Sequence, residues 1–454
     1  MITEARAVAL EVVRATFEDG AFTERAFREA ADARELSGRD RAQSQRLAYG
    51  AVQRRGTSDA AIARLSSRPP QRLDPPVVAA LRLGLYELLF TDATPDHAAV
   101  DQAVESVKEA GAAHATGLVN AVLRRATRER DELTAALLDD DSTPERAAVA
   151  HSAPTWLARM WWEELGPDGA RSLLASCNEP SEVALRTTVP PPEAIASELH
   201  DEGVDVSPAQ GEWPLAAPEI LVLAGRMGEG VLGRIRAGEL TPQSRGSAAV
   251  IEVLDPRPGE HVLDLCAGPG IKTGQIAARL EDRGETISFE LDAERAAEVA
   301  AQAGRLGLRS ITVVEADAAA GGMAPGFDRV LVDAPCSDLG ALASRPDARW
   351  RKSPRGIERL AEVQGRLLAR AAEALRPGGT LVYATCTISR RENEDRVAAL
   401  LEASAGGEGP PLAIEDLGAR APGLASPHDA RCLQVRPDRD RTTGFFICRL
   451  RRDD

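Results

Sequence analysis

The stretch VLDLCAGPGIKT, residues 262–273, runs from an apolar segment through a glycine-rich turn toward a helix. Gly268 and Gly270 lack side chains where the backbone must turn sharply and approach a ligand, and Pro269 stiffens the loop. The first amides of the following helix would face whatever binds there. The GxGxxG pattern of pyrophosphate-binding loops is absent, which disfavours a dinucleotide. An ordinary tight turn between a strand and a helix remains the alternative interpretation.

Outward from this turn, residues 246–454 alternate between strand-like and helical segments. The strand-like runs are His261–Leu265, Thr286–Leu291, Ile311–Glu315, Arg329–Val332 and Thr380–Ala384, with two late strands near Leu433–Arg436 and Phe445–Leu450. Strands that alternate with helices predict a parallel, doubly wound α/β sheet of the Rossmann-like kind. In such sheets, ligands bind at the carboxyl ends of the strands, near the point where the strand order reverses.

Acidic residues end the second and third of these strands. The second strand ends in Phe289-Glu290-Leu291-Asp292, and the third ends in Glu315-Ala316-Asp317. An acid after the second strand is placed to accept hydrogen bonds from both ribose hydroxyls of a nucleoside. An acid after the third strand can reach the exocyclic amine of an adenine. One exposed acid at a strand end is ordinary, but together with the glycine-rich turn these two ends favour S-adenosylmethionine over NAD.

Two of the six cysteines end the fourth and fifth strands, in Asp333-Ala334-Pro335-Cys336-Ser337 and Ala384-Thr385-Cys386-Thr387. A cysteine is most often a buried small hydrophobe, and either one alone would be interpreted in that way. Two of them at the ligand-binding edge favour covalent catalysis. A thiolate that adds to carbon 6 of cytosine makes carbon 5 a nucleophile for a methyl sulfonium. An acid near ring N3, such as Asp333, would offset the charge formed on addition.

Together these motifs resemble the RNA cytosine-5 methyltransferases of the Sun/Fmu (RsmB and NOP) family. VLDLCAGPGIKT is similar to the family's cofactor motif VLDLCAAPGGKT, and DAPCS and YATCT are similar to its two cysteine motifs. The strand end Asn/Asp-Pro-Pro-aromatic, which is typical of enzymes that methylate exocyclic amines, is absent. The resemblance covers residues 240–450. It implies transfer of a methyl group from S-adenosylmethionine to carbon 5 of a cytosine in small-subunit (16S) rRNA.

The resemblance also implies roles for individual residues. The nucleophile of the family is the cysteine of the TC motif, which falls on Cys386, and the cysteine of the PC motif, Cys336, assists product release. Asp333 and Lys272 complete the implied catalytic set, and Lys272 is one of only three lysines in the chain. The implied cofactor contacts are Cys266, Ala267, Gly268, Pro269, Gly270, Ile271, Lys272, Glu290, Asp317 and Asp333.

Several positions depart from the family's pattern, among them Thr187 and Thr188 for its usual Val-Asn, Thr443 for its usual Asp, and three positions at the cofactor site. Gly268 and Ile271 stand where the family usually has Ala and Gly, and Glu290 stands where it usually has Asp. Isoleucine is β-branched, so a positive φ at Ile271 would be strained. Glu290 is one methylene longer than aspartate but can make the same ribose contact.

Residues 1–135 show helical periodicity and no alternating strand pattern. Val119, Val122, Leu123 and Ala126 occupy the i, i+3, i+4 and i+7 positions of one helix face. This predicts an all-α bundle, which, with GLVNAVLRR at 117–125, resembles the NusB-like RNA-binding domain of the family. Further helices are predicted near 24–33, 39–66, 75–90 (with Asp74 as its cap) and 96–110.

Residues 136–245 mix the two kinds of structure. Helical stretches near 154–165 and 168–177 precede a strand-like run, Val183–Val189. We expect a small α+β domain that takes part in RNA recognition. The predicted domains are therefore 1–135, 136–245 and 246–454.

Composition limits the possible classes of protein. The 454 residues are 43% hydrophobic and 28% charged, which is typical of a soluble protein of two or three domains. No apolar run approaches the roughly 18 residues of a membrane helix. The histidines show no ligand spacing, and the cysteines form no CxxC pair, so no metal site is predicted. We expect a cytoplasmic monomer.

The net charge of −15 argues against one large cationic surface for nucleic acid. Two local features remain candidates for RNA contact. One is the helix end with Arg124, Arg125, Arg128 and Arg130, for which an ion-paired, solvated helix end is the alternative. The other is the segment 345–370, which has eight basic and three acidic residues and contains Trp350.

The expected partner is rRNA whose target cytosine is unpaired or flipped out, because a stacked cytosine hides its carbon 6. Two other functions remain open. One is the same chemistry on tRNA. The other is an RNA-binding or ribosome-assembly protein whose methyltransferase domain has decayed, and only the changes at Gly268 and Ile271 favour it.

Overall fold

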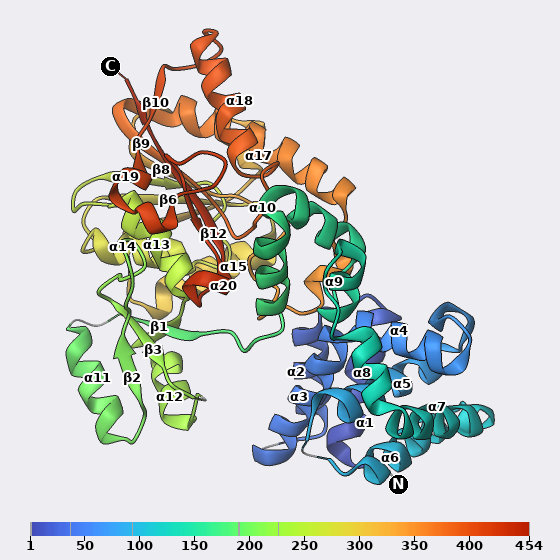
Figure 1. The fold of residues 1–454 in the computed structure, drawn as a ribbon. Helices are drawn as coiled ribbons and strands as arrows, with labels where there is room; N and C mark the ends of the chain where they lie inside the picture. The colour runs from blue at the N-terminus through green and yellow to red at the C-terminus, as the bar shows by residue number, and fades with distance from the viewer. Residues whose placement is uncertain (1, 37, 93, 189–190, 226, 454) are drawn as a thin grey trace. The chain divides into compact units, whose positions relative to one another are not determined.

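The computed structural model describes residues 2–36, 38–92, 94–188, 191–225 and 227–453, and the chain divides into two compact units (Figure 1). The first, here called the helical unit, comprises Met1–Glu179 and Leu342–Arg351. The second, the sheet unit, comprises Pro180–Ala341 and Lys352–Asp454. Within the described residues, no helix combines the length and the apolar character that crossing a membrane requires.

The helical unit is an all-α bundle, as the sequence predicted. α5 (Pro75–Phe90) buries side chains all around its axis, which is typical of a helix in the interior of a bundle. α7 (Thr116–Arg128) buries Val119, Val122, Leu123 and Ala126, the four positions of the predicted stripe. The other α-helices before residue 180 are α1 (Glu4–Phe17), α2 (Thr23–Ala33), α3 (Gly38–Gln53), α4 (Arg55–Ser66), α6 (Asp96–Glu109), α8 (Arg130–Leu137), α9 (Pro144–Ala150) and α10 (Thr155–Ser176).

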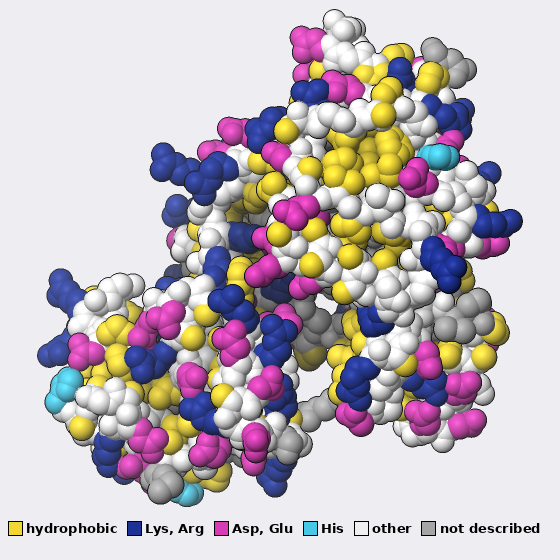
Figure 2. All heavy atoms as spheres, turned by 180° about the vertical axis from the view of Figure 1, so that it is seen from behind, with side chains coloured by type: hydrophobic (Ala, Val, Ile, Leu, Met, Phe, Trp, Pro, Cys, Tyr) yellow, Lys and Arg dark blue, Asp and Glu magenta, His cyan; other side chains and the backbone are white. Residues whose placement is uncertain are grey.

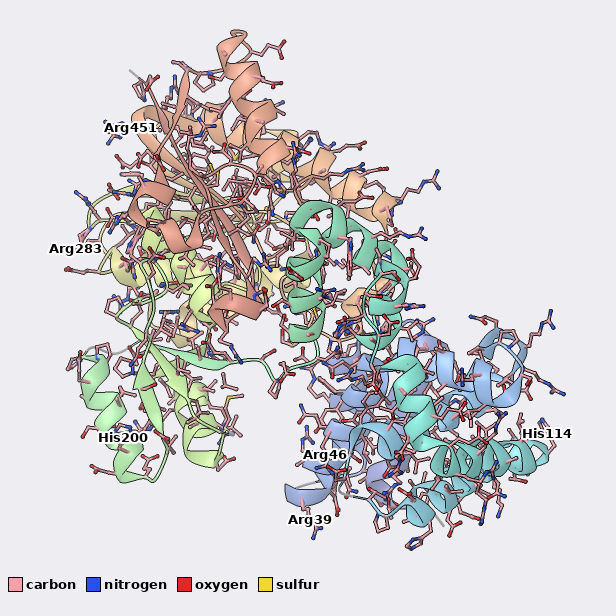
Figure 3. The ribbon with its side chains drawn as sticks, in the orientation of Figure 1. Arg39, Arg46, His114, His200, Arg283 and Arg451 are labelled. Carbon is pink, nitrogen blue, oxygen red and sulfur yellow. The ribbon has the colours of Figure 1, made fainter. Side chains whose placement is uncertain are left out.

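Two local predictions in this unit are wrong. The segment 39–66 is two helices, α3 and α4, because the backbone leaves helical geometry at Arg54, with φ −90° and ψ 16°. Asp74 makes no side-chain hydrogen bond to the start of α5. Its carboxylate instead lies 3.1 Å from Nε2 of His114, which Figure 3 labels in the short turn before α7.

A four-stranded antiparallel sheet forms the small α+β part of the sheet unit. Its strand order is β2-β3-β1-β4, and α11 and α12 accompany it. The predicted end of β1 at Val189 lies outside the described residues. The bounds are β1 (Val183–Thr187), α11 (Pro192–Asp201), β2 (Val206–Pro208), β3 (Ile220–Leu223), α12 (Glu229–Ala237) and β4 (Leu240–Pro242).

A buried polar network joins this small sheet to the larger one. Arg186 on β1 donates to Oε1 of Gln243 at 2.8 Å, and Nε2 of Gln243 donates to Gln275 on α14 (Ile271–Arg279) at 2.5 Å. Glu219 accepts from both Gln275 and Arg279 of the same helix. Buried polar groups need such partners, so the network fixes the small sheet against the helix that begins at the glycine-rich turn.

An eight-stranded sheet forms the α/β part of the unit. Its order is β10-β12-β9-β8-β5-β6-β7, with β11 paired to β12. The five strands from β9 to β7 are parallel, and the order reverses between β5 and β8, as in a doubly wound sheet. The bounds are β5 (His261–Asp264), β6 (Glu285–Glu290), β7 (Ile311–Glu315), β8 (Phe327–Asp333), β9 (Leu375–Thr385), β10 (Leu412–Ile414), β11 (Leu433–Val435) and β12 (Phe445–Arg452).

Successive residues of the central strands enter two different hydrophobic cores. Val262, Leu331 and Val382 pack with α13 (Arg245–Leu254) and α14, whereas Leu263, Val330 and Leu381 pack with α17 (Pro354–Ala374) and α18 (Glu394–Ala405). Both faces of the sheet are therefore covered by helices, as the continuous apolar strands indicate.

The structure adds details that the sequence did not supply. β12 runs antiparallel to β9, so the sheet is mixed, and the short strand β10 was not predicted. The two predicted helical stretches 154–165 and 168–177 are confirmed, since α10 is broken into two helices at Gly166 (φ 71°, ψ 173°), and they belong to the helical unit. The division at 135 and 245 remains a prediction, whereas the compact units change over between Glu179 and Pro180.

Candidate active site

The glycine-rich turn lies between β5 and α14, at the carboxyl end of the sheet. Gly270 caps α14 with a φ of 96°, a left-handed conformation that glycine adopts without steric cost. A Cβ at this position would lie 3.1 Å from Cα of Val299. Ile271 is the first residue of α14 and has no positive φ, so the strain expected at this position is absent. The replacement of the family's glycine by isoleucine is compatible with this turn.

Glu290, at the end of β6, holds the turn through backbone hydrogen bonds. Its Oε2 accepts from the N–H of Gly268 at 2.9 Å, and its Oε1 accepts from the N–H of Asp292 at 3.1 Å. A Cβ on residue 268 would lie 2.3 Å from Oε2 of Glu290. The longer acid and the smaller loop residue therefore fit each other, and these two departures from the family's pattern are sterically linked.

Glu290 is buried, whereas the residues beside it at the ends of β6 and β7 are exposed. Leu291 is 70% exposed and is one of three large hydrophobic side chains that the described surface exposes. Asp317 follows β7 and is also exposed, and its carboxylate accepts from the N–H of Ala319 at 2.9 Å. An apolar side chain and two acids therefore line the ends of β6 and β7.

Lys272 and Asp333 form an ion pair at the switch point. Nζ of Lys272 lies 2.7 Å from Oδ2 of Asp333 and 4.9 Å from the ring centroid of Phe445. Behind the pair, Asp264 is buried and accepts from the hydroxyl of Thr273 at 2.7 Å. Burial raises the pKa of Asp264 to about 6, and the negative charge of Asp333 adds to the increase. Burial also raises the pKa of the neighbouring Cys266 thiol well above its usual range, which suits a structural thiol.

The two predicted catalytic thiols lie within hydrogen-bond distance of each other. Asp333 pairs with Ala384 in the register of β8 and β9, so the chain segments that follow each strand leave the sheet side by side. Sγ of Cys336 lies 3.3 Å from Sγ of Cys386. Cys336 is 7% exposed, and its hydrogen bond with Cys386 together with burial holds its pKa well above the usual range for a thiol. Cys336 is therefore a neutral thiol, and Cys386 is the more accessible of the two.

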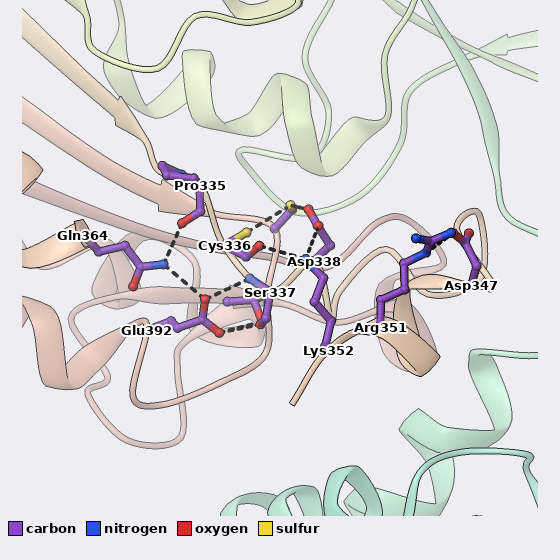
Figure 4. Close-up of polar contacts among 11 residues, drawn as sticks. Pro335, Cys336, Ser337, Asp338, Asp347, Arg351, Lys352, Gln364 and Glu392 are labelled. Atoms are coloured by element: carbon purple, nitrogen blue, oxygen red, sulfur yellow. Dashed lines mark hydrogen bonds and ion pairs between the residues drawn. The ribbon is translucent and has the colours of Figure 1, made fainter. Parts of the chain in front are cut away.

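A carboxylate and an ammonium group complete the thiol site (Figure 4). The thiol of Cys386 donates to Oδ1 of Asp338 at 3.1 Å. Nζ of Lys352 lies 2.9 Å from Oδ2 of the same carboxylate. The sequence analysis missed both residues. Asp338 directly follows the PCS motif, and this position was the available signal.

The chain was compared with known proteins on this basis. The family model described as 16S rRNA methyltransferase RsmB/F matches residues 251–451, and the NusB family matches residues 3–128. The chain is 33% identical, over 99% of both sequences, to the "Probable ribosomal RNA small subunit methyltransferase B" of Bacillus subtilis (strain 168). The chain belongs to the RsmB/F family of 16S rRNA methyltransferases.

Other relatives of the RsmB/F chain agree with this assignment. The protein of the same description in Synechocystis sp. (strain ATCC 27184 / PCC 6803 / Kazusa) is 31% identical over 99% of both sequences. The crystal structure of PH0851 is similar over 99% of both chains, with a TM-score of 0.79 and 25% identity. The helical unit thus contains the family's N-terminal NusB domain, and the α/β part of the sheet unit is its methyltransferase domain.

Glu392 is a third residue of this RsmB/F chain that the sequence analysis missed. It is fully buried behind the PCS motif, where it accepts from the N–H of Ser337 at 2.9 Å and from Nε2 of Gln364 at 3.1 Å (Figure 4). Gln364 also donates to the carbonyl of Pro335 at 2.9 Å. Burial raises the pKa of the Glu392 carboxyl. No local sequence pattern indicates this role of Glu392, because the residue lies 55 positions after Ser337, whose loop it holds in place.

Trp350 of the candidate RNA-contact segment packs against the core of the helical unit. The segment 342–351 belongs to the helical unit, where Nε1 of Trp350 donates to the carbonyl of Val52 at 2.9 Å. Arg349 is buried beside it and donates to the carbonyls of Ser152 and Cys177 at 3.0 and 2.8 Å. The polar groups of Trp350 and Arg349 therefore bind backbone carbonyls of the protein. Within the same predicted segment, Arg355, Arg359 and Arg366 are exposed on α17, and Arg345 and Arg351 are exposed before this helix.

The arginine cluster at the end of α7 is paired with neighbouring acids. Arg125 and Arg128 both bond Glu129, and Arg130 lies 2.5 Å from Asp96. The ion-paired helix end, the alternative given above, describes this cluster better than a free RNA-binding patch. On the face shown in Figure 2, basic and acidic side chains are interspersed, in agreement with the absence of one large cationic surface.

Proposed function

We propose that the chain transfers a methyl group from S-adenosylmethionine to carbon 5 of a cytosine in 16S rRNA through a covalent adduct with Cys386. The observation that carries this proposal is the pair of thiols 3.3 Å apart at the carboxyl ends of β8 and β9. Methylation of an exocyclic amine needs no thiol, whereas carbon 5 of cytosine becomes nucleophilic only after addition at carbon 6.

The strand ends fit S-adenosylmethionine. The carboxylate of Glu290 uses one lone pair on each oxygen for the loop, which leaves acceptor sites for two ribose hydroxyls. The exposed Leu291 suits the apolar face of an adenine, and Asp317 suits its amine. The turn from Cys266 to Lys272 would surround the methionine part. When bound, the cofactor supplies an electrophilic methyl group.

Each side chain of the thiol site has a distinct part in the proposed reaction. Cys386 attacks carbon 6, because it is the more accessible thiol. Asp333 binds the base at N3, and Lys272 holds its second oxygen in place. Cys336, a neutral thiol beside the sulfur of Cys386, helps the adduct to resolve and the product to leave. The base must be unpaired or flipped out to reach this edge.

The remaining parts of the chain suit an RNA substrate. Arg355, Arg359 and Arg366 lie on exposed positions of α17, which begins just after Lys352, and they would contact phosphates. We further propose that the enzyme acts as a cytoplasmic monomer without a metal. The decayed-enzyme alternative loses its support, because Gly268 and Ile271 both fit the turn.

The direct test is methyl transfer to protein-free 16S rRNA, with small ribosomal subunits and total tRNA in parallel, each sequenced after bisulfite treatment. One new protected cytosine in the rRNA is the expected result. Protection of a cytosine only in tRNA would support the proposed reaction but show that the substrate is tRNA and not 16S rRNA. No protection in any of the three substrates would contradict the proposal.

A second test addresses the thiols. We expect Cys336→Ala to accumulate an RNA–protein adduct that survives a denaturing gel, because release is impaired while addition remains possible. Cys386→Ala should form none. Adduct formation by Cys386→Ala would show that the roles are assigned to the wrong thiols.

A further inference from the structure

Asp338 has an unusual backbone for a residue with a side chain. Its φ is 58°, in the left-handed region that glycine occupies freely and that other residues enter at an energetic cost. Aspartate tolerates this conformation better than most residues, but it is still less favourable than glycine. Side chains in such conformations concentrate at functional sites, where the surroundings hold them in place.

The conformation directs the carboxylate of Asp338 between two charged or reactive groups. Oδ1 is 3.1 Å from Sγ of Cys386, and Oδ2 is 2.9 Å from Nζ of Lys352 (Figure 4). About a quarter of each of the Asp338 and Lys352 side chains is exposed, so the pair borders the space from which a substrate approaches Cys386. Lys352 also donates to the carbonyl of Cys336 at 3.4 Å, which ties it to the loop of the second thiol.

We propose that Asp338 is the proton acceptor for the Cys386 thiol during its attack on carbon 6, and that Lys352 is the positioning residue that keeps this carboxylate ionised and oriented. The inference rests on the proposed function, in which Cys386 is the nucleophile. A thiol that donates to a carboxylate carries its proton, whereas the thiolate is the nucleophile, so the proton has to leave as the bond to carbon forms. Oδ1 of Asp338 accepts that hydrogen bond, so no rearrangement is needed.

The step balances within the site. The S–H electron pair stays on sulfur as the proton passes to Oδ1, and a sulfur lone pair forms the bond to carbon 6. The electron pair of the C5=C6 bond moves to carbon 5 and into the ring. Once carbon 5 carries the methyl group, elimination breaks the C5–H bond: its proton leaves to solvent and its electron pair re-forms the C5=C6 bond. The S–C6 pair returns to sulfur, and Asp338 gives its proton back to that sulfur. Asp338 therefore ends each turnover ionised, as it began.

Charged and reactive side chains face the carboxylate of Asp338 on both oxygens. Lys352 faces Oδ2, Cys386 faces Oδ1, and Cys336 and Glu392 lie behind the two thiols. The ammonium of Lys352 favours the ionised carboxylate, whereas the negative charge of Glu392 opposes a further charge. The neutral Cys336 thiol can donate to the sulfur of Cys386 once that sulfur has lost its proton. The arrangement thus supplies one proton acceptor and one hydrogen-bond donor to the same atom.

The test measures adduct formation in single turnover, in a Cys336→Ala background where the adduct accumulates. Asp338→Asn keeps the shape and the tolerance of a left-handed φ but removes the basic oxygen. We expect it to slow adduct formation roughly 100-fold at pH 7. The residual rate should rise about 20-fold between pH 7 and pH 9, because the thiol must then lose its proton to solvent before it attacks. The difference from the parent should narrow to roughly 5-fold at pH 9.

Two controls separate proton transfer from structure. Asp338→Gly relieves the backbone conformation, so it should fold at least as well as the parent and still show the same slow, pH-dependent rate. Asp255→Asn removes the carboxyl of another aspartate with a left-handed φ, 52°, at the end of α13, and should leave the rate unchanged.

The outcomes distinguish the inference from the function on which it rests. If Cys336→Ala forms no adduct with RNA, the proposed function fails, and the role of Asp338 fails with it. If the adduct forms at the same rate with aspartate, asparagine and glycine at position 338, only the present inference is overturned. A rate lowered equally at every pH would indicate a structural role and would also overturn it.

Discussion

The sheet unit contains two pairs of neighbouring thiols whose surroundings differ. Cys336 and Cys386 lie 3.3 Å apart, beside the Asp338–Lys352 ion pair, and Cys386 is accessible. Cys432 directly precedes β11 and Cys448 lies on β12, and both are fully buried in the core that α17 and α18 cover. A hydrogen bond with Cys448, together with burial, raises the pKa of Cys432 far above its usual range. Proximity of two thiols is common to both pairs, and only access and charged neighbours distinguish a candidate nucleophile from core packing.

The largest expected effect separates the pairs by activity. Cys386→Ala should lower methyl transfer roughly 10⁴-fold or more, because the covalent step is lost. Cys448→Ala should keep the activity and lower the free energy of unfolding by about 1–2 kcal/mol, since it leaves only a small cavity. Methyl transfer to the RNA substrate and thermal unfolding are measured on both variants. If both variants were folded and lost methyl transfer equally, the two pairs of thiols would not differ in function.

Alkylation sharpens the same contrast without RNA. Iodoacetamide should modify Cys386 at least roughly 100-fold faster than Cys432 or Cys448, because a buried thiol reacts only after local opening of the structure. Peptide mapping by mass spectrometry over a time course gives the individual rates. Comparable labelling of Cys432 in the native protein would show that burial does not protect it.

A buried carboxyl extends the comparison from thiols to acids. The pKa of Asp264 is raised to about 6 by burial, against an ordinary value of 3.8, so the native state binds its proton more tightly than the unfolded state does. Its contribution to stability is complete below pH 3.8 and is lost as the pH rises toward 6, by about 3 kcal/mol. Asp264→Asn should remove this part of the pH dependence. Urea unfolding of the parent and the variant at pH 4 and pH 6.5 gives the free energy of unfolding at each pH. The same change with pH in both proteins would contradict the role of burial.

The smallest effect concerns the cofactor turn and should leave both thiol pairs unchanged. Gly268→Ala places a Cβ 2.3 Å from Oε2 of Glu290, and the clash should weaken binding of S-adenosylmethionine roughly 10-fold, or about 1.4 kcal/mol. Adding Glu290→Asp shortens the acid and should restore most of the affinity. Calorimetric titration of the single and double variants tests this link. Additive losses would show that the two positions are independent.

The sequence predicted those features that depend on local pattern. Apolar runs separated by helices placed the strands within a few residues, and the rule that ligands bind at strand ends placed Cys336 and Cys386 at one edge. The helix stripe of α7 was likewise visible because every member lies within eight residues. Local periodicity carries this information directly.

Features that depend on contacts distant in the chain could not be predicted. Asp338 reaches Cys386 across 48 residues, and the role of Glu392 requires a loop 55 residues earlier. Trp350 and its neighbouring arginines resemble an RNA-binding segment in composition, and only the helical unit shows that they are packing residues. Composition cannot distinguish a charge that faces solvent from one that binds buried carbonyls.

The inclusion of residues 342–351 in the helical unit has a consequence for the order of synthesis. Buried Arg349 satisfies the carbonyls of Ser152 and Cys177, which would otherwise lack this donor. A ribosome delivers Arg349 about 170 residues after Cys177, when the strands β5 to β8 have already been made. The N-terminal bundle therefore cannot form its last buried hydrogen bonds until strands β5 to β8, half of the larger sheet, have been synthesised. The donor for these bonds, Arg349, lies in the segment of chain that follows β8.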